Sequence, residues 1–237
     1  MTTPMSTAPR TRIKMCGFTR EADVDVAVQT GADAIGFVLY PPSPRAVSIE
    51  RAGALAARLP AFVTPVLLFV NDTPERVRQA CAAVPGALMQ FHGDESPAYC
   101  TEMSQRTGRA HLKAARIPLS TPLPTDLQAD ARFDLLEFAQ LHHNAQAILL
   151  DAHVDGFGGG GKAFDWSLLP PNVNAHLVLS GGLTPANVVD GIRTLRSRAR
   201  SLAVDVSSGI EAAKGLKDAE KMWQFVRAVR SADNDAC

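Results

Sequence analysis

Short apolar runs alternate with longer stretches of helical spacing along almost the whole sequence. The short runs are rich in β-branched residues and have the length of strands, while the stretches between them are rich in Ala, Leu, Glu and Arg. Strands that alternate with helices form parallel sheets, so this pattern predicts an α/β fold. Eight strands are expected, at residues 12–16, 34–39, 64–70, 87–91, 110–115, 147–151, 176–180 and 202–206.

Helices are expected between these strands and after the last one. They fall at residues 21–30, 48–58, 74–83, 97–106, 130–138, 185–195 and 217–230, with a short one near Trp166. The expected N-caps are Ser48, Thr73, Ser96 and Thr184, and the last three precede a Pro, which suits the first position of a helix. Eight βα units in 237 residues match a single closed (β/α)8 barrel, or TIM barrel, for which about 250 residues is typical. An open doubly wound sheet is the alternative.

The composition and the ends of the chain limit its organisation and its partners. Residues 1–11 are rich in Thr, Pro and Ser and are predicted to be a disordered leader, residues 12–230 to form the catalytic barrel, and residues 231–237 to be a flexible tail. Lys plus Arg and Asp plus Glu both number 24, and this balance argues against a nucleic-acid partner. No run approaches the roughly 20 apolar residues of a membrane span, and no signal peptide is recognisable. We therefore expect a cytoplasmic chain without a membrane partner.

A barrel of this kind concentrates its chemistry where strands end, because the loops that follow them open on one face. The first strand ends in Lys14-Met15-Cys16. Side chains alternate along a strand, so Ile13 and Met15 should face the helices, while Lys14 and Cys16 face the interior. Cys16 could be a general base if its pKa falls from about 8.5 toward neutral, which a nearby ammonium group would favour. A small buried hydrophobe is the other interpretation of this thiol.

The sixth strand ends in a carboxylate, Asp151, directly after the apolar residues 148–150. Desolvation disfavours the charged form of such a group, so Asp151 could act as a general acid near neutral pH. A cap on the following turn is the alternative. The four glycines at 158–161 would then form a mobile flap that closes over the site and excludes water.

Other polar residues follow the second and fourth strands. Arg45 comes after a loop stiffened by three prolines and could hold a substrate carboxylate with both edges of its guanidinium, although a single surface Arg is also commonly just solvated. Gln90 and His92 share one face at the end of the fourth strand. They could contact substrate, and a core or capping role for the histidine is the alternative.

Glycine and serine follow the last two strands. Gly181 and Gly182 come after the seventh, and Ser207, Ser208 and Gly209 after the eighth. Backbone N–H groups in the last two loops of a barrel often hold a phosphate group. The pair of loops therefore predicts a phosphate site, and hence a phosphorylated substrate.

These motifs together closely resemble those of the phosphoribosylanthranilate isomerases of tryptophan biosynthesis. The resemblance spans about residues 12–230 and rests on motifs in family order: KMCGFT, GADAIGFVLYPPSPRAVS, FVN, QFHGDE, ILLDAHVDGFGGGGKAFDWS, LVLSGGLTPANV and AVDVSSGIE. It implies an Amadori rearrangement, an intramolecular aldose–ketose isomerisation that converts N-(5-phosphoribosyl)anthranilate to 1-(2-carboxyphenylamino)-1-deoxyribulose 5-phosphate. It also implies that no metal and no organic cofactor takes part.

The resemblance also implies a role for each matching residue. The family's general base falls on Cys16, its general acid on Asp151, and its arginine for the anthranilate carboxylate on Arg45. Asp205 is implied to contact the sugar hydroxyls or to orient the base, and it could instead neutralise Lys14 as a buried pair. The phosphate loops correspond to Gly181, Gly182, Ser207, Ser208 and Gly209. Gln90 and His92 are predicted as substrate contacts from their place at the end of the fourth strand.

Some positions depart from the family pattern, and two other functions compete with this interpretation. The flap reads GGGGK where GGTGK is common, His153 replaces a common aromatic such as Tyr, and Ser180 replaces a frequent Ala. A related isomerase of histidine biosynthesis uses Asp where Cys16 stands and resembles two duplicated half-barrels, a repeat that this sequence lacks. A non-catalytic phosphosugar-binding barrel would need no thiol and carboxylate at its mouth. The resembling family contains monomers and homodimers, so the oligomeric state stays open.

Overall fold

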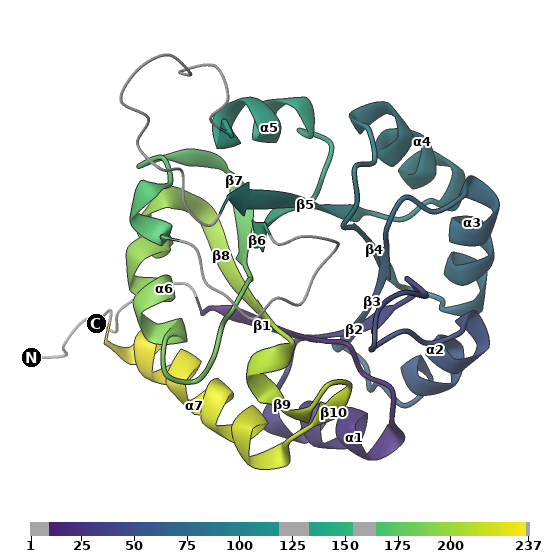
Figure 1. The fold of residues 1–237 in the computed structure, drawn as a ribbon, viewed down its shortest axis with the longest axis horizontal. Coiled ribbons are helices and arrows are strands. Elements are labelled where there is room, and N and C mark those ends of the chain that lie inside the picture. Colours follow the sequence, from purple (N-terminus) through teal and green to yellow (C-terminus); the bar gives the residue numbers. More distant parts are fainter. Residues whose placement is uncertain (1–9, 119–132, 154–164, 236–237) are drawn as a thin grey trace, which may run out of the picture.

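A computed structural model describes residues 10–118, 133–153 and 165–235. Its eight parallel strands close into a barrel in chain order, β1 to β8, with helices outside (Figure 1). The predicted TIM barrel is therefore confirmed, and the open sheet is excluded. The strands are β1 (Arg12–Cys16), β2 (Ala34–Val38), β3 (Thr64–Phe69), β4 (Leu88–Phe91), β5 (His111–Pro118), β6 (Ala147–His153), β7 (Val173–Leu179) and β8 (Ala199–Val206).

The helices follow the strands as expected; the helices at 21–30 and 74–83 have the predicted bounds, and the others have shifted ends. They are α1 (Glu21–Thr30), α2 (Ile49–Ala56), α3 (Pro74–Ala83), α4 (Pro97–Thr107), α5 (Leu135–Leu141), α6 (Val188–Leu195) and α7 (Ala219–Asn234). The short helices η2 (Trp166–Leu168), η3 (Arg196–Arg198) and η4 (Ser208–Ile210) are 3₁₀ turns. After β8 the chain adds an antiparallel pair, β9 (Glu211–Ala213) and β10 (Leu216–Lys217), which the sequence did not predict.

Three of the four predicted N-caps form, and one does not. The hydroxyl groups of Ser48, Thr73 and Ser96 each accept a hydrogen bond from a backbone N–H in the first turn of the next helix. Thr184 was expected to cap a helix from residue 185, but α6 begins at Val188. The intervening residues form a turn because Asn187 folds back, its Oδ1 accepting from Thr184 N at 2.8 Å and its Nδ2 donating to Gly182 O at 3.0 Å.

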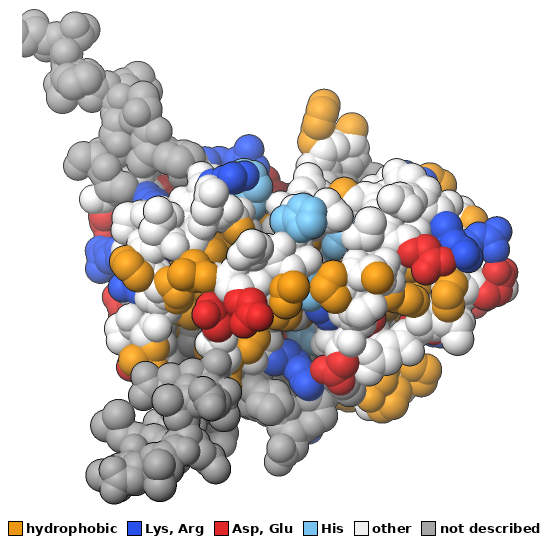
Figure 2. All heavy atoms as spheres, turned by 90° about the horizontal axis from the view of Figure 1, so that it is seen from above, with side chains coloured by type: hydrophobic (Ala, Val, Ile, Leu, Met, Phe, Trp, Pro, Cys, Tyr) orange, Lys and Arg blue, Asp and Glu red, His pale blue; other side chains and the backbone are white. Residues whose placement is uncertain are grey.

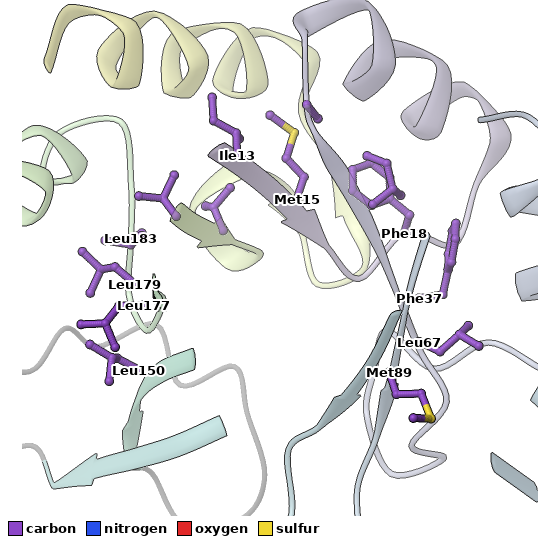
Figure 3. Packing of buried hydrophobic residues seen from close by; sticks show 14 of the residues in the cluster. Ile13, Met15, Phe18, Phe37, Leu67, Met89, Leu150, Leu177, Leu179 and Leu183 are labelled. Atoms are coloured by element: carbon purple, nitrogen blue, oxygen red, sulfur yellow. The ribbon is translucent and has the colours of Figure 1, made fainter. Parts of the chain in front are cut away.

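The main core lies between the barrel and the helices, as the strand alternation requires. Ile13 and Met15 are fully buried there, and Figure 3 shows both pointing from β1 toward the helices. Inside the barrel a smaller apolar cluster fills the lower layers, and it includes Val66, Leu149 and Val178. The interior is thus packed rather than hollow, and only its upper layer is free to carry polar groups.

The part of the chain that packs into the barrel is longer at both termini than residues 12–230. Thr11 is buried, and its backbone N–H and hydroxyl group donate to Asp233 at the end of α7. Helix α7 continues to Asn234, so residues 231–234 of the predicted tail are helical. Ala232 packs into the core, and Asp233 accepts hydrogen bonds from Thr11 just before β1. The remaining leader, residues 1–9, lies outside the described residues.

The surface carries charges of both signs. Figure 2 shows acidic and basic side chains interspersed over one face, which agrees with the neutral formal charge. Within the described ranges, no helix is both long enough and apolar enough to cross a membrane.

Candidate active site

The mouth of the barrel gathers the predicted polar residues at the carboxyl ends of the strands. Cys16 ends β1, Asp205 lies near the end of β8, His92 follows β4 and Asp151 lies near the end of β6. All four residues are at most 8% exposed. Buried polar groups must find partners, so the geometry of each can be traced through its hydrogen bonds.

The thiol of Cys16 lies beside a buried ion pair. Lys14 Nζ donates to Asp205 Oδ2 at 2.7 Å, and the strand register places Lys14 directly opposite Asp205. The predicted inward direction of Lys14 and Cys16 follows from this contact. Opposite Cys16 on β2 stands Gly36, where a Cβ atom would lie 2.6 Å from the sulfur. The glycine therefore leaves room for the thiol at the mouth.

The protonation of these groups follows from burial and from their neighbours. Burial raises the pKa of the Cys16 thiol above its ordinary value, although the Lys14 and Lys217 ammonium groups pull it down. The described neighbours alone therefore do not supply the fall toward neutral on which the base role of Cys16 depends. Burial alone would lower the pKa of Lys14, but attraction to Asp205 and Cys16 raises it above its ordinary value. Lys14 thus stays charged beside the thiol.

A second ion-pair group surrounds Arg45 on the neighbouring side of the mouth. Arg45 donates from Nε and Nη2 to the two carboxylate oxygens of Glu211, both at 2.7 Å. Lys217 Nζ reaches Glu211 Oε1 at 2.9 Å. Burial works to raise the pKa of Glu211, but the two cations outweigh it and lower that pKa. A carboxylate on β9 thus fixes the predicted carboxylate-binding arginine, and the Nη1 edge of the guanidinium lies outside this contact.

A hydrogen-bonded chain connects β4 with β6. Gln90 Nε2 lies 2.9 Å from His92 Nδ1, and His92 Nε2 lies 2.9 Å from Asp151 Oδ2. The other oxygen, Asp151 Oδ1, accepts from Ala152 N at 3.0 Å. Sequence reasoning named Gln90, His92 and Asp151 separately, and the structure brings the three side chains together.

The predicted phosphate loops lie next to one another and next to Asp151. Gly181 has a φ of +77°, and a Cβ atom there would lie 2.5 Å from Ala152 N and 2.9 Å from Asp151 Oδ1. A Cβ atom on Gly209 would lie 1.9 Å from Leu183 O, so the two loops touch. Within the described part of the chain, the N–H groups of Gly181 and Gly182 donate to no other residue.

Ser207 has a different contact from the rest of its loop. Its hydroxyl group donates to the carbonyl of Cys16 at 3.0 Å and accepts from Lys217 Nζ at 3.3 Å. Ser208 and Gly209 begin η4, and the first N–H groups of such a turn have no partner within it. The hydroxyl of Ser207 is therefore engaged with β1, while the backbone of Ser208 and Gly209 stays open to an anion.

Sequence reasoning missed two functional candidates and made one prediction that falls outside the described residues. Glu211 and Lys217 carried no local signal beyond their place in AVDVSSGIE and shortly after it.

The glycine flap at residues 158–161 lies outside the described residues. Among the residues that the structure does describe, no three His, Cys, Asp or Glu side chains are arranged to hold a metal ion.

Comparison with known proteins assigns this barrel to a family. The family model for N-(5'-phosphoribosyl)anthranilate isomerase matches residues 13–228. The chain belongs to the phosphoribosylanthranilate isomerase family. The resemblance noted from the sequence motifs is thereby confirmed, together with the activity class: an isomerase of tryptophan biosynthesis.

Individual phosphoribosylanthranilate isomerases are similar over nearly their full length. The relative from Leptothrix cholodnii is 59% identical over 224 residues, which cover 94% of this chain and 93% of that protein. The solved structure from Thermotoga maritima is 37% identical with a TM-score of 0.78, over 93% of this chain and 99% of that one. Another family structure, in complex with reduced 1-(o-carboxyphenylamino)-1-deoxyribulose 5-phosphate, is 35% identical with a TM-score of 0.75, over 93% and 99% of the two chains.

Proposed function

We propose that the chain converts N-(5-phosphoribosyl)anthranilate to 1-(2-carboxyphenylamino)-1-deoxyribulose 5-phosphate with Asp151 as general acid and Cys16 as general base. One observation carries this assignment. A buried thiol and a buried carboxylate end two strands of one closed barrel, and each has its own set of hydrogen-bonded or charged neighbours. Acid and base can thus act on different sides of one small substrate.

Asp151 performs the first step by opening the sugar ring. It gives its proton to the furanose ring oxygen, the bond between C1 and that oxygen breaks, and the nitrogen lone pair forms an iminium ion at C1. The carboxylate left behind keeps two donors, Ala152 N–H on Oδ1 and the His92 ring on Oδ2. These contacts stabilise the charge that Asp151 acquires as it releases the proton.

Cys16 performs the second step by removing the proton from C2. The C2–H electrons form a C1–C2 double bond and neutralise the iminium nitrogen, and the resulting enolamine tautomerises to the ketone. Burial raises the pKa of the thiol, so before the ring opens few molecules hold a thiolate at neutral pH. The positive iminium ion favours the thiolate beside it. The base thus becomes effective only after the ring has opened.

The remaining predicted residues bind the substrate in this proposal. Asp205 Oδ1 is buried and has no partner among the described residues, so it can accept a sugar hydroxyl. The free edge of Arg45 takes the anthranilate carboxylate. The phosphate group binds between the two glycine loops, on the backbone N–H groups of residues 181, 182, 208 and 209, with Ser207 holding its loop against Cys16.

Every proposed step is a proton transfer between this chain and its substrate, so the proposal includes no metal and no organic cofactor. The partner is a small phosphorylated molecule rather than a nucleic acid. A cytoplasmic location and a monomeric or homodimeric state remain predictions. One solved structure holds monomers generated from the dimeric phosphoribosylanthranilate isomerase of Thermotoga maritima. Sedimentation of the purified protein would distinguish the two states here.

The decisive test follows the loss of phosphoribosylanthranilate fluorescence. Cys16→Ala and Asp151→Asn should each reduce kcat by about 10²-fold to 10⁴-fold, the usual contribution of a positioned acid or base. Cys100→Ala is the matched control, because Cys100 is a buried thiol outside the mouth and should keep nearly full activity. Full activity of either mouth variant would refute the assigned role.

The two competing functions give different results in the same assay. Turnover of the aminated ribose phosphate of histidine biosynthesis, rather than of phosphoribosylanthranilate, would favour the related isomerase. Tight product binding without turnover would favour a non-catalytic barrel. Gln90 and His92 were expected to contact substrate, and their contact with Asp151 supports a different role for them.

A further inference from the structure

The side chain of Gln90 is connected to the proposed general acid, Asp151, through His92. Gln90 is fully buried, and its Oε1 has no hydrogen-bond partner among the described residues. An unpaired buried amide oxygen costs about 1–3 kcal/mol. Its Nε2, by contrast, is engaged with His92 Nδ1 at 2.9 Å. The orientation that leaves the oxygen unpaired therefore needs a compensating reason.

The reason lies in the direction of the hydrogen bonds. Ala152 N–H donates to Asp151 Oδ1, so His92 is the group that can donate to Oδ2 when the carboxylate is ionised. A neutral imidazole carries one proton, and donation from Nε2 requires Nδ1 to accept. Gln90 Nε2 supplies that hydrogen. Its amide nitrogen, not its oxygen, must therefore face the ring.

We infer that Gln90 is a positioning residue that holds His92 in the tautomer protonated at Nε2, so that His92 donates to Asp151 and stabilises the carboxylate formed during ring opening. The inference rests on the proposed role of Asp151. It assigns Gln90 and His92 to the acid rather than to direct substrate contact. No proton leaves His92 in this role, because the proton for the sugar comes from Asp151.

Two cations of β5 lie near this pair. Arg116 stands opposite Asp151 in the strand register, and its Nη2 donates to Asp94 Oδ1 at 3.1 Å. Lys113 points to the outer side of the barrel, where Nζ binds Gly93 O and Glu95 Oε2, both at 2.7 Å. Its alternation with Leu112 and Ala114, which belong to the interior cluster, fixes that direction. The imidazole is thus the group that the structure shows against Oδ2 of Asp151.

The tautomer of His92 tests the inference by ¹⁵N NMR of the full chain. Signals are assigned with a His92→Gln variant. The wild-type protein should show His92 protonated at Nε2 only. Gln90→Glu, which has no N–H to offer, should place a proton on Nδ1, while the same change at exposed Gln105 should leave the spectrum of His92 as it is. Wild-type His92 protonated at Nδ1 would overturn the inference without any variant.

Activity gives a second, separate measurement. Gln90→Glu should lower kcat by roughly 10-fold to 100-fold with little change in KM, since orienting partners typically contribute that much. Gln90→Met, of similar shape without hydrogen bonds, should give mixed tautomers and an intermediate kcat. An unchanged tautomer in both variants would show a purely structural role and refute the inference. Full activity of Asp151→Asn would instead refute the proposed function, so the two failures are distinguishable.

Discussion

At the scale of single residues, the surroundings of the proposed acid favour its charged form, whereas those of the proposed base disfavour it. The Asp151 carboxylate has two donors in place, whereas the Cys16 thiol lies where burial raises its pKa. The Lys14 ammonium lowers the pKa of the thiol and so opposes the effect of burial, and Asp205 holds Lys14 in position. The thiol is therefore restrained from ionising until a positive charge forms next to it.

Replacing Lys14 tests this balance. Lys14→Met removes an ammonium that lowers the pKa of Cys16 and exposes the thiol to the Asp205 charge, so that pKa should rise further. Iodoacetamide labelling at pH 7 to 9 should become slower, with its pH profile displaced upward. Lys14→Met combined with Asp205→Asn should recover part of the rate, because the repulsive charge is gone.

The labelling experiment needs a background without other reactive thiols. Burial raises the pKa of Cys81 and of Cys100 to about 11, so both react slowly. Cys237 lies outside the described residues and is replaced by Ser, and Cys16→Ala gives the residual rate. An identical pH profile with and without Lys14 would discard the coupling between Lys14 and Cys16.

At the scale of elements, the loops after β7 and β8 are held by side chains that the sequence did not single out. Asn187 closes the turn after β7, and Glu211 on β9 fixes Arg45. Thr184-Pro185 has the pattern of a helix start, but that local preference is overridden because Asn187 satisfies the backbone of the turn instead. Such contacts join residues whose partners depend on the folded loop, so spacing alone could not predict them.

Asn187→Ala should loosen the loop that carries Gly181 and Gly182. Both side-chain contacts of Asn187 are lost, which is worth about 1 kcal/mol or more, so KM should rise roughly tenfold. The value of kcat should change little, because neither Cys16 nor Asp151 is touched. Ser96→Ala is the control, since it costs a similar cap bond in α4, far from the phosphate loops. A normal KM in Asn187→Ala would contradict the role of this loop.

At the scale of the whole molecule, the strand pattern was sufficient to predict the closed barrel and to place Cys16 and Asp151 at the carboxyl ends of their strands. Alternation along β1 correctly separated Ile13 and Met15 from Lys14 and Cys16. The chain termini were harder to place. Thr11 and Asp233 look like parts of polar ends. Thr11 is buried and Asp233 half-buried because α7 packs back against the start of β1.

Asp233 should make stability depend on acid pH. Burial works to raise its pKa, but hydrogen bonds from Thr11 and charges on Arg230 and Arg196 lower it below the ordinary value. A lowered folded-state pKa gives stability that is present above the unfolded pKa of about 4 and is lost as pH falls through the folded pKa. The Tm should therefore drop between pH 5 and pH 3.

Asp233→Asn should flatten that acid dependence. At pH 7 the free energy of unfolding of the variant should fall by about 2 kcal/mol, hence Tm by roughly 4–8 °C. The reason is that the hydrogen bonds from Thr11, Arg196 and Arg230 would then go to a neutral amide. Asp94→Asn is the control, since Asp94 is an exposed carboxylate in a single surface pair. Thermal unfolding followed by circular dichroism measures both. An acid dependence as steep as that of the wild type would contradict the anchoring role of Asp233.

The central claim divides the reaction between two residues, and the isotope effect of deuterium at C2 of the substrate tests that division most directly. In Cys16→Ala, removal of the C2 proton should become rate-limiting, so the deuterated substrate should turn over with a full primary isotope effect. In Asp151→Asn, ring opening should limit the rate and the effect should nearly vanish. The reverse pattern, or equal effects in both variants, would contradict the account.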